Sequence, residues 1–223
     1  MSSVSEEQLF KRQEEQSKVA LKYYESCRQE TMERLKMRDQ IVVAYVGAVV
    51  ALFGYASRSP TGGSADYLAM LESPLFQLLP ILLAFLALVA SYSVAQHQEQ
   101  IQALSEYYAF DLTKFLPACG AEVTVWEKST PLHTTAKRAL TTVLIGQIVL
   151  FSGPWFVPTL LYGPFYFHGS SMRLKDGIVL PSALIIVMAI VRVCQAWKFR
   201  LDSARRIEKT LPHIPTARVK VKP

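Results

Sequence analysis

The stretch LFQLLPILLAFLALVASYSV, residues Leu75–Val94, decides the fold class of this chain. It contains no charged residue, and soluble core helices rarely stay so apolar on every face. A helix needs about 20 mostly apolar residues to cross the hydrocarbon core of a bilayer. The stretch therefore predicts a transmembrane helix, with a soluble protein containing buried helices as the weaker alternative.

Three further stretches share this character, one before it and two after it. Together with 75–94, the sequence predicts spans at residues 41–56, 139–161 and 178–197. The first span is close to the lower length limit for crossing a bilayer, so a three-span protein is the alternative. The expected fold class is an all-α integral membrane protein with four transmembrane helices.

Lysine and arginine are concentrated in three segments that flank the spans. Eight lie in residues 1–40, four in residues 95–138 and nine in residues 192–223, against one and two in the two remaining connections. Segments rich in positive charge stay on the cytoplasmic side of a membrane. We therefore expect both termini in the cytoplasm and the lipid bilayer as the main partner. The net charge of +6 then needs no nucleic-acid partner.

The cytoplasmic segments are expected to be long helical extensions of the spans that form a bundle, either within one subunit or between several subunits. Residues 5–40 lack Gly and Pro and are rich in good helix formers, so residues 1–40 should run into the first span as one helix. Residues 95–138 should hold a helix that continues to Pro117, then a loop with a short strand near residues 123–126. A new helix should begin at Ser129-Thr130-Pro131. Residues 198–223 should hold a helix that Pro212 stops, followed by a basic tail. In the first extension, a half-apolar stripe should face the bundle: Leu21, Tyr24, Arg28, Thr31 and Leu35.

The first span carries a stripe of small residues on one helix face. They are Ala44, Gly47, Ala48, Ala51 and Gly54, and Thr142, Gly146 and Gly153 repeat the pattern more weakly in the third span. Small residues let membrane helices approach closely. The stripe predicts a helix-packing face, whose partner is either another helix of the same subunit or another subunit.

Four residues inside the spans are candidates for a pore or gate. Gln147 lies within an apolar run, where its amide either bonds a neighbouring helix or faces water in a pore. Pro154 and Pro158 should kink or break the outer half of the third span, and Pro80 should kink the second. Broken backbone at membrane depth is buried in protein or lines a watery cavity.

Three residues are expected at the membrane interface. Arg192 lies near the cytoplasmic end of the fourth span, where its long stem can reach the headgroups; a gating or ligand-binding role is the alternative. Trp155 and Trp197 lie near the ends of their spans, where aromatic residues are enriched.

Motifs for catalysis, metal binding or cofactor binding are not found in the sequence. The four histidines are far apart, and no HExxH, P-loop, GxSxG or Cys/His metal spacing is present. We therefore expect no enzyme and no cofactor, and an enzyme acting on lipid is the weakest of the hypotheses.

The segment that leads into the first span, together with that span, resembles a known group of membrane proteins. The stretch YYESCRQETMERLKMRDQIVVAYVGAVVALFGYA, residues 23–56, together with the four-span architecture, resembles small multi-pass membrane proteins of bacterial anti-phage defence operons, such as the membrane subunit of the Kiwa system. The resemblance implies the bacterial inner membrane. It also implies work with a cytoplasmic partner, either to permeabilise the membrane or to anchor a complex.

Two functions are expected on these grounds. The first is an oligomeric membrane effector or pore-type subunit in antiviral defence, triggered through its cytoplasmic helices. The second is a membrane anchor or sensor that recruits a soluble cytoplasmic protein without conducting ions. The expected partners are the lipid bilayer, further copies of the chain and a soluble cytoplasmic protein.

Overall fold

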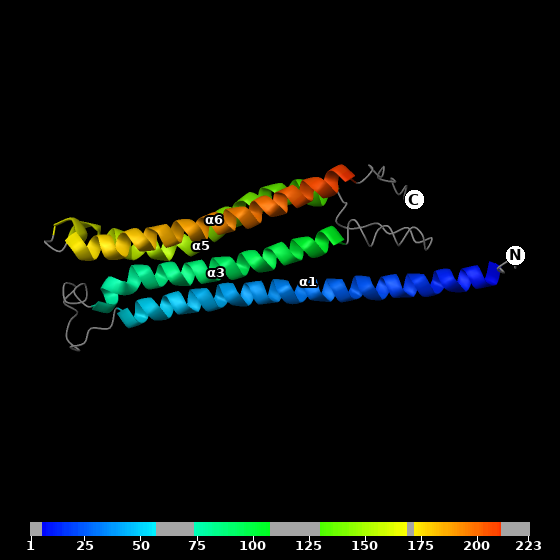
Figure 1. Cartoon of the computed structure of the whole chain (residues 1–223), viewed down its shortest axis with the longest axis horizontal. Coiled ribbons are helices and arrows are strands. Elements are labelled where there is room, and N and C mark those ends of the chain that lie inside the picture. The colour runs from blue at the N-terminus through cyan, green and yellow to red at the C-terminus, as the bar shows by residue number, and fades with distance from the viewer. Residues whose placement is uncertain (1–5, 57–73, 108–129, 169–171, 211–223) are drawn as a thin grey trace, which may run out of the picture.

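The described part of the chain consists of four long α-helices. In this computed structural model they are α1 (Glu6–Ala56), α3 (Pro74–Tyr107), α5 (Thr130–His168) and α6 (Met172–Thr210), and residues outside them are not described. The helices run side by side along one long axis (Figure 1). All four are long and apolar enough to cross a membrane, so the all-helical class and four candidate membrane helices are confirmed.

The ends of the helices follow local sequence signals. The 51 residues of α1 form one helix, about 75 Å long at 1.5 Å per residue, because no Gly or Pro interrupts it before the span. Helix α5 begins at Thr130, directly before Pro131, and α6 ends at Thr210, two residues before Pro212. The continuation of α3 past Tyr107 and the strand near residues 123–126 lie outside the described residues.

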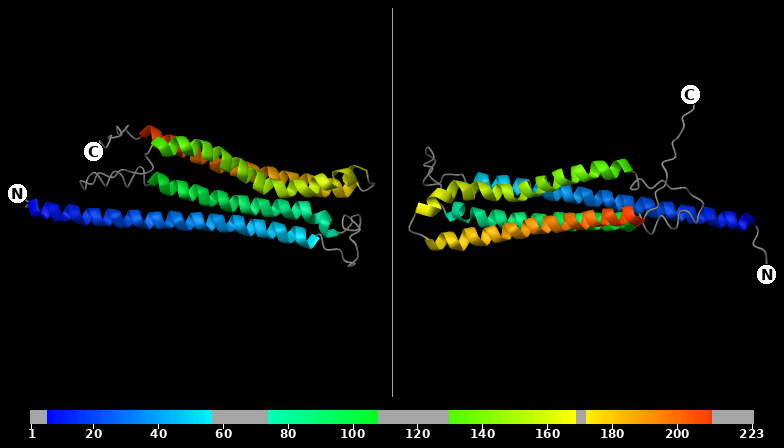
Figure 2. Two further views of the ribbon diagram at one scale, coloured as in Figure 1. Left: turned by 180° about the vertical axis from the view of Figure 1, so that it is seen from behind. Right: turned by 90° about the horizontal axis from the view of Figure 1, so that it is seen from above.

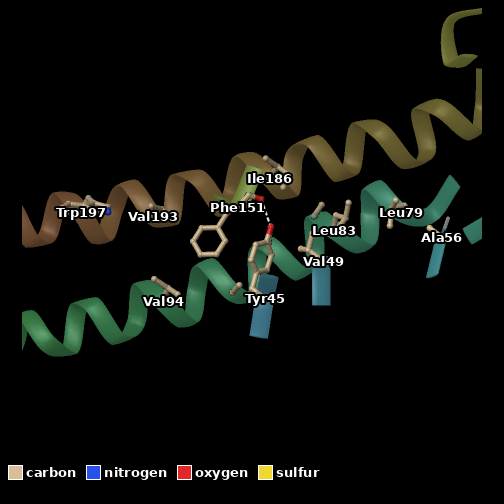
Figure 3. Close-up of a cluster of buried hydrophobic side chains, with 13 residues drawn as sticks. Tyr45, Val49, Ala56, Leu79, Leu83, Val94, Phe151, Ile186, Val193 and Trp197 are labelled. Atoms are coloured by element: carbon tan, nitrogen blue, oxygen red, sulfur yellow. Dashed lines mark hydrogen bonds between the residues drawn. The ribbon is translucent and has the colours of Figure 1, made fainter. Parts of the chain in front are cut away.

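Helix α5 passes through Pro154 and Pro158 as one helix, so of the two expectations for its outer half, a kink or a break, the break is not observed. Pro154 has no N–H for the carbonyl of Leu150, which lies four residues earlier. The hydroxyl of Tyr45 on α1 donates to the carbonyls of Leu150 and Phe151, at 3.3 and 3.2 Å (Figure 3). A neighbouring helix thus supplies a donor to the freed carbonyl, as is common where membrane helices contain a proline.

Helix α3 is the centre of the bundle, because it packs against α1, α5 and α6. Figure 2 shows from two further sides how α5 and α6 lie together while α1 follows α3. The apolar core extends along the helices from Leu79 to Trp197 and includes an edge-to-face pair of Tyr45 and Phe151, with ring centroids 5.2 Å apart (Figure 3).

Small side chains recur on the buried faces of α3 and α6, which pack against each other more extensively than any other two helices. On α6 they recur every seven residues, and each is at most 2% exposed: Ser182, Ala189, Ala196 and Ser203. On α3, Ala84, Ala87 and Ser91 are fully buried. Small residues at heptad spacing let two membrane helices pack closely along their length. The main small-residue interface within the chain therefore lies here and not on α1.

Beyond the apolar segment, the helical extensions pack against one another within one chain. Ala20 and Cys27 of α1 contact Leu104 of α3, and Gln102 of α3 donates to Ser203 of α6 at 2.6 Å. Of the expected stripe on α1, Leu21 and Tyr24 are 57% and 38% exposed, so the bundle within one chain does not bury them. The face that packs on α3 starts one residue earlier, at Ala20, where a small side chain allows close approach.

Candidate functional site

Polar and charged side chains of three helices meet where the apolar segment ends and the extensions begin. We call this region the polar layer; it comprises Arg34 and Arg38 of α1, Gln98–Gln102 of α3, and residues 192–203 of α6. Arg34 of α1 donates to Gln100 of α3, and Gln102 of α3 donates to Ser203 of α6. Hydrogen bonds therefore join α3 to α1 and to α6 in the polar layer.

The strongest contact of the polar layer joins Arg192 of α6 to Glu99 of α3. Two guanidinium nitrogens donate to the two carboxylate oxygens at 2.6 and 2.8 Å, and the guanidinium lies 5.4 Å from the ring centre of Tyr92. Such a bidentate pair fixes geometry as well as charge. The sequence predicts headgroup contact for Arg192 and carries no signal for Glu99 as its partner, because the two residues are 93 positions apart.

Gln147 has a protein partner on the neighbouring helix. The indole N–H of Trp197 on α6 donates to its side-chain oxygen at 3.1 Å. Of the two alternatives for this amide, the bond to an adjacent helix is the one observed. Trp197 is 3% exposed, so its side chain lies inside the bundle. Trp155 is half-buried, and its N–H donates to Ser182 at 3.0 Å.

The prolines proposed for a gate are core residues of the bundle. Pro80 and Pro158 are fully buried, and Pro154 is half-buried. Pro80 lies inside α3, which continues on both sides of it. At these buried and half-buried positions, the three prolines pack against neighbouring side chains of the bundle.

The small-residue stripe of α1 points away from the other helices. Ala44, Gly47, Ala51 and Gly54 are exposed, and Ala48 is half-buried, whereas Tyr45 and Val49 between them face the core. A Cβ added at Gly47 or Gly54 would meet no heavy atom within 4 Å. The same holds for Gly146 and Gly153 of α5. The stripe therefore does not contribute to helix packing within the chain. It leaves one face of α1 that carries only small side chains and that no other described helix covers.

Metal-type clusters are not found in the described helices, where no three His, Cys, Asp or Glu side chains are placed to hold an ion. Comparison of the chain with protein-family models, with curated proteins and with solved structures gives no match.

Proposed function

We propose that the chain is a membrane anchor that recruits a soluble cytoplasmic protein through the projecting part of α1, in the defence setting that the resemblance of residues 23–56 implies. The observation that carries the proposal is the reach of α1 beyond the end of α3 (Figure 1). The N-terminal residues 6–28 of α1 are called the arm; its first part projects, and its second part also packs on the end of α3 through Ala20 and Cys27.

The arm carries large apolar side chains on a face turned away from α3. Phe10, Leu21 and Tyr24 are 70%, 57% and 38% exposed. Their spacing of eleven and three residues places them on one side of a helix, together with the exposed Arg28. An amphipathic helix that leaves such a face uncovered is suited to lie in a groove of a partner protein.

The interior of the bundle favours an anchor over a channel within one subunit. The space between the helices is filled by apolar side chains, and Gln147 is bonded to Trp197. A conducting path through the middle of one chain would need polar groups facing water along its length. A pore would therefore have to form between subunits.

The double variant Leu21→Ser with Tyr24→Ser tests the anchor. The full chain is purified in nanodiscs after expression with its neighbouring genes, and co-purifying protein is quantified. We expect the variant to lose a specific partner by at least about tenfold, since truncating a central apolar or aromatic anchor of a binding face costs about 1 kcal/mol or more.

The matched control is Tyr23→Ser, which removes an aromatic side chain that is 59% exposed on another face of the same helix turn. It should retain the partner at the wild-type level. Equal partner recovery from the double variant and wild type would contradict the anchor.

A homo-oligomeric effector is the second candidate, and the open small-residue face of α1 favours it. Association of subunits through this face would bring α1 helices together and leave any conducting path between copies. The variant Gly47→Leu should weaken association in nanodiscs by about tenfold or more, measured as the particle mass against concentration.

Val50→Leu serves as the control for Gly47→Leu, because Val50 is 65% exposed and already carries a branched side chain. If the wild-type chain is a single subunit at all concentrations, the oligomeric effector is excluded. If it associates and Gly47→Leu leaves the mass unchanged, the contact lies elsewhere.

A further inference from the structure

Two helix faces on different sides of α3 are left uncovered by the described part of the chain. One is the small-residue face of α1. The other, called the outer face of α6, carries four large side chains that are all exposed: Leu180, Leu184, Val187 and Val191. Their spacing of four, three and four residues places them on one side of the helix. Because α3 lies between α1 and α6, each bundle offers one small face and one large face on its flanks (Figure 1).

The contacts of α3 give the relative heights of α1 and α6 along the bundle. Arg34 of α1 donates to Gln100 of α3, and Gln102 of α3 donates to Ser203 of α6. Helix α1 runs antiparallel to α6, whereas α3 runs parallel to it (Figure 1). With 1.5 Å per residue, these two bonds place each residue of α1 level with a residue of α6 to within about one turn.

Small residues of α1 and large residues of α6 then alternate at matching heights. Four small residues lie level with four large ones, in this order: Ala44, Gly47, Ala51 and Gly54 with Val191, Val187, Leu184 and Leu180. Copies that share one orientation in the membrane keep these heights. The large side chains of one copy can therefore fill the space above the small residues of the next, which is how membrane helices pack closely.

Towards the cytoplasmic extension, the same face of α1 continues into a hollow of about 430 Å³. Its lining comes from one side of the helix: Ser26, Gln29, Glu30, Glu33, Arg34 and Met37. Glu33 lies eleven and eighteen residues before Ala44 and Ala51, which are whole numbers of helical turns, so it shares their face. Its carboxylate accepts from Gln29 at 3.2 Å and pairs with no cation of the described helices.

Lys198 supplies the opposite charge on α6. It lies eleven residues after Val187, which is three turns, so it continues the outer face of α6. Its side chain is exposed, and no carboxylate within the described ranges pairs with it. By the heights given above, Lys198 lies level with Met37, one turn from Glu33. The four-carbon stem of a lysine spans that distance.

The same charges disfavour a contact of α1 with α1. Two copies of one orientation that met through the small-residue face would place Glu33 of one copy opposite Glu33 of the other. Like charges that face each other across an interface are costly. The outer face of α6, with Lys198 at its end, is therefore the better partner for this face.

We propose that the small-residue face of α1 binds the outer face of α6 in a second copy of the chain, with Lys198 of that copy entering the hollow beside Glu33. The inference rests on the homo-oligomeric effector and names the contact that assembles it. Because the two faces differ, the contact is heterologous, and its repetition around an axis normal to the membrane gives a ring.

Cysteine cross-linking tests which helices meet. The three natural cysteines are replaced by serine, and Ala51→Cys with Leu184→Cys is introduced into the full chain, which is oxidised in the membranes of the expressing cells. We expect dimers and higher multimers on a gel without reductant, because each copy links through both faces. The matched control is Ala51→Cys with Phe85→Cys, which is exposed on α3 at about the height of Leu184 and should stay monomeric.

Charge reversal tests the proposed ion pair. Glu33→Lys and Lys198→Glu should each weaken association by about tenfold, measured as particle mass against concentration in nanodiscs, and the double variant should restore it. Glu25→Lys, on another exposed face of α1, should associate like wild type. Single reversals that leave association unchanged overturn the pairing of Lys198 with Glu33.

The outcomes separate this contact from the oligomer itself. If Ala51→Cys alone gives dimers and no higher multimers, α1 meets α1, which overturns the inference and leaves the oligomeric effector standing. An associating chain in which Ala51→Cys with Leu184→Cys gives no cross-link overturns it as well. A single subunit at every concentration removes both the contact and the effector.

Discussion

The variant Ala189→Leu is expected to separate α3 from α6 and to destabilise the chain by about 1–3 kcal/mol, the usual cost of forcing extra methylene groups into a packed core. Ala189 is 1% exposed and belongs to the heptad of small residues on α6. In a bilayer the surrounding lipid would be as apolar as the core, so close packing and not the hydrophobic effect would hold these helices together. A larger side chain at position 189 therefore weakens the close packing between α3 and α6.

The measurement is the melting temperature of the purified chain in detergent micelles, with Ala51→Leu as the control. Ala51 undergoes the same change on the exposed face of α1, where the new side chain meets lipid or detergent. Its melting temperature should equal that of wild type when the chain is a single subunit. If Ala189→Leu melts like Ala51→Leu, the contact between α3 and α6 is not the one described.

Breaking the pair of Arg192 and Glu99 is expected to have the second large effect. The side chains are only 20% and 32% exposed, and each loses its charged partner when the other is neutralised. Arg192→Gln or Glu99→Gln should each destabilise the chain by about 2 kcal/mol, somewhat less than for a fully buried pair because water or headgroups reach part of the site.

A double-mutant cycle distinguishes this pair from general effects of charge. The double variant with both residues changed to glutamine should be more stable than the sum of the single effects implies, since no unpaired charge is left. Asp202→Gln with Arg205→Gln is the matched cycle, in which the side chains are 48% and 69% exposed and lie on one helix. It should show a coupling below about 1 kcal/mol. Equal coupling in the two cycles would contradict the role of burial.

The helices were predictable because their signals are local. The charge-free run of residues 75–94 predicts a membrane helix by itself, the absence of Gly and Pro from residues 5–40 predicts the unbroken α1, and Pro131 and Pro212 mark the start of α5 and the end of α6. Each of these features acts on backbone bonds within a few residues of itself, so no knowledge of the neighbouring helices is needed.

Only the tertiary structure decided which faces pack. The stripe of Ala44, Gly47 and Ala51 and the heptad of Ser182, Ala189 and Ala196 both have the composition of a packing face, but only the second is buried within the chain. Tyr45 keeps α5 intact at Pro154, and Glu99 pairs with Arg192, across separations of 105 and 93 residues. Such contacts depend on how the helices are rotated about their axes. That rotation is set by the sum of all side chains in the bundle and not by any one segment.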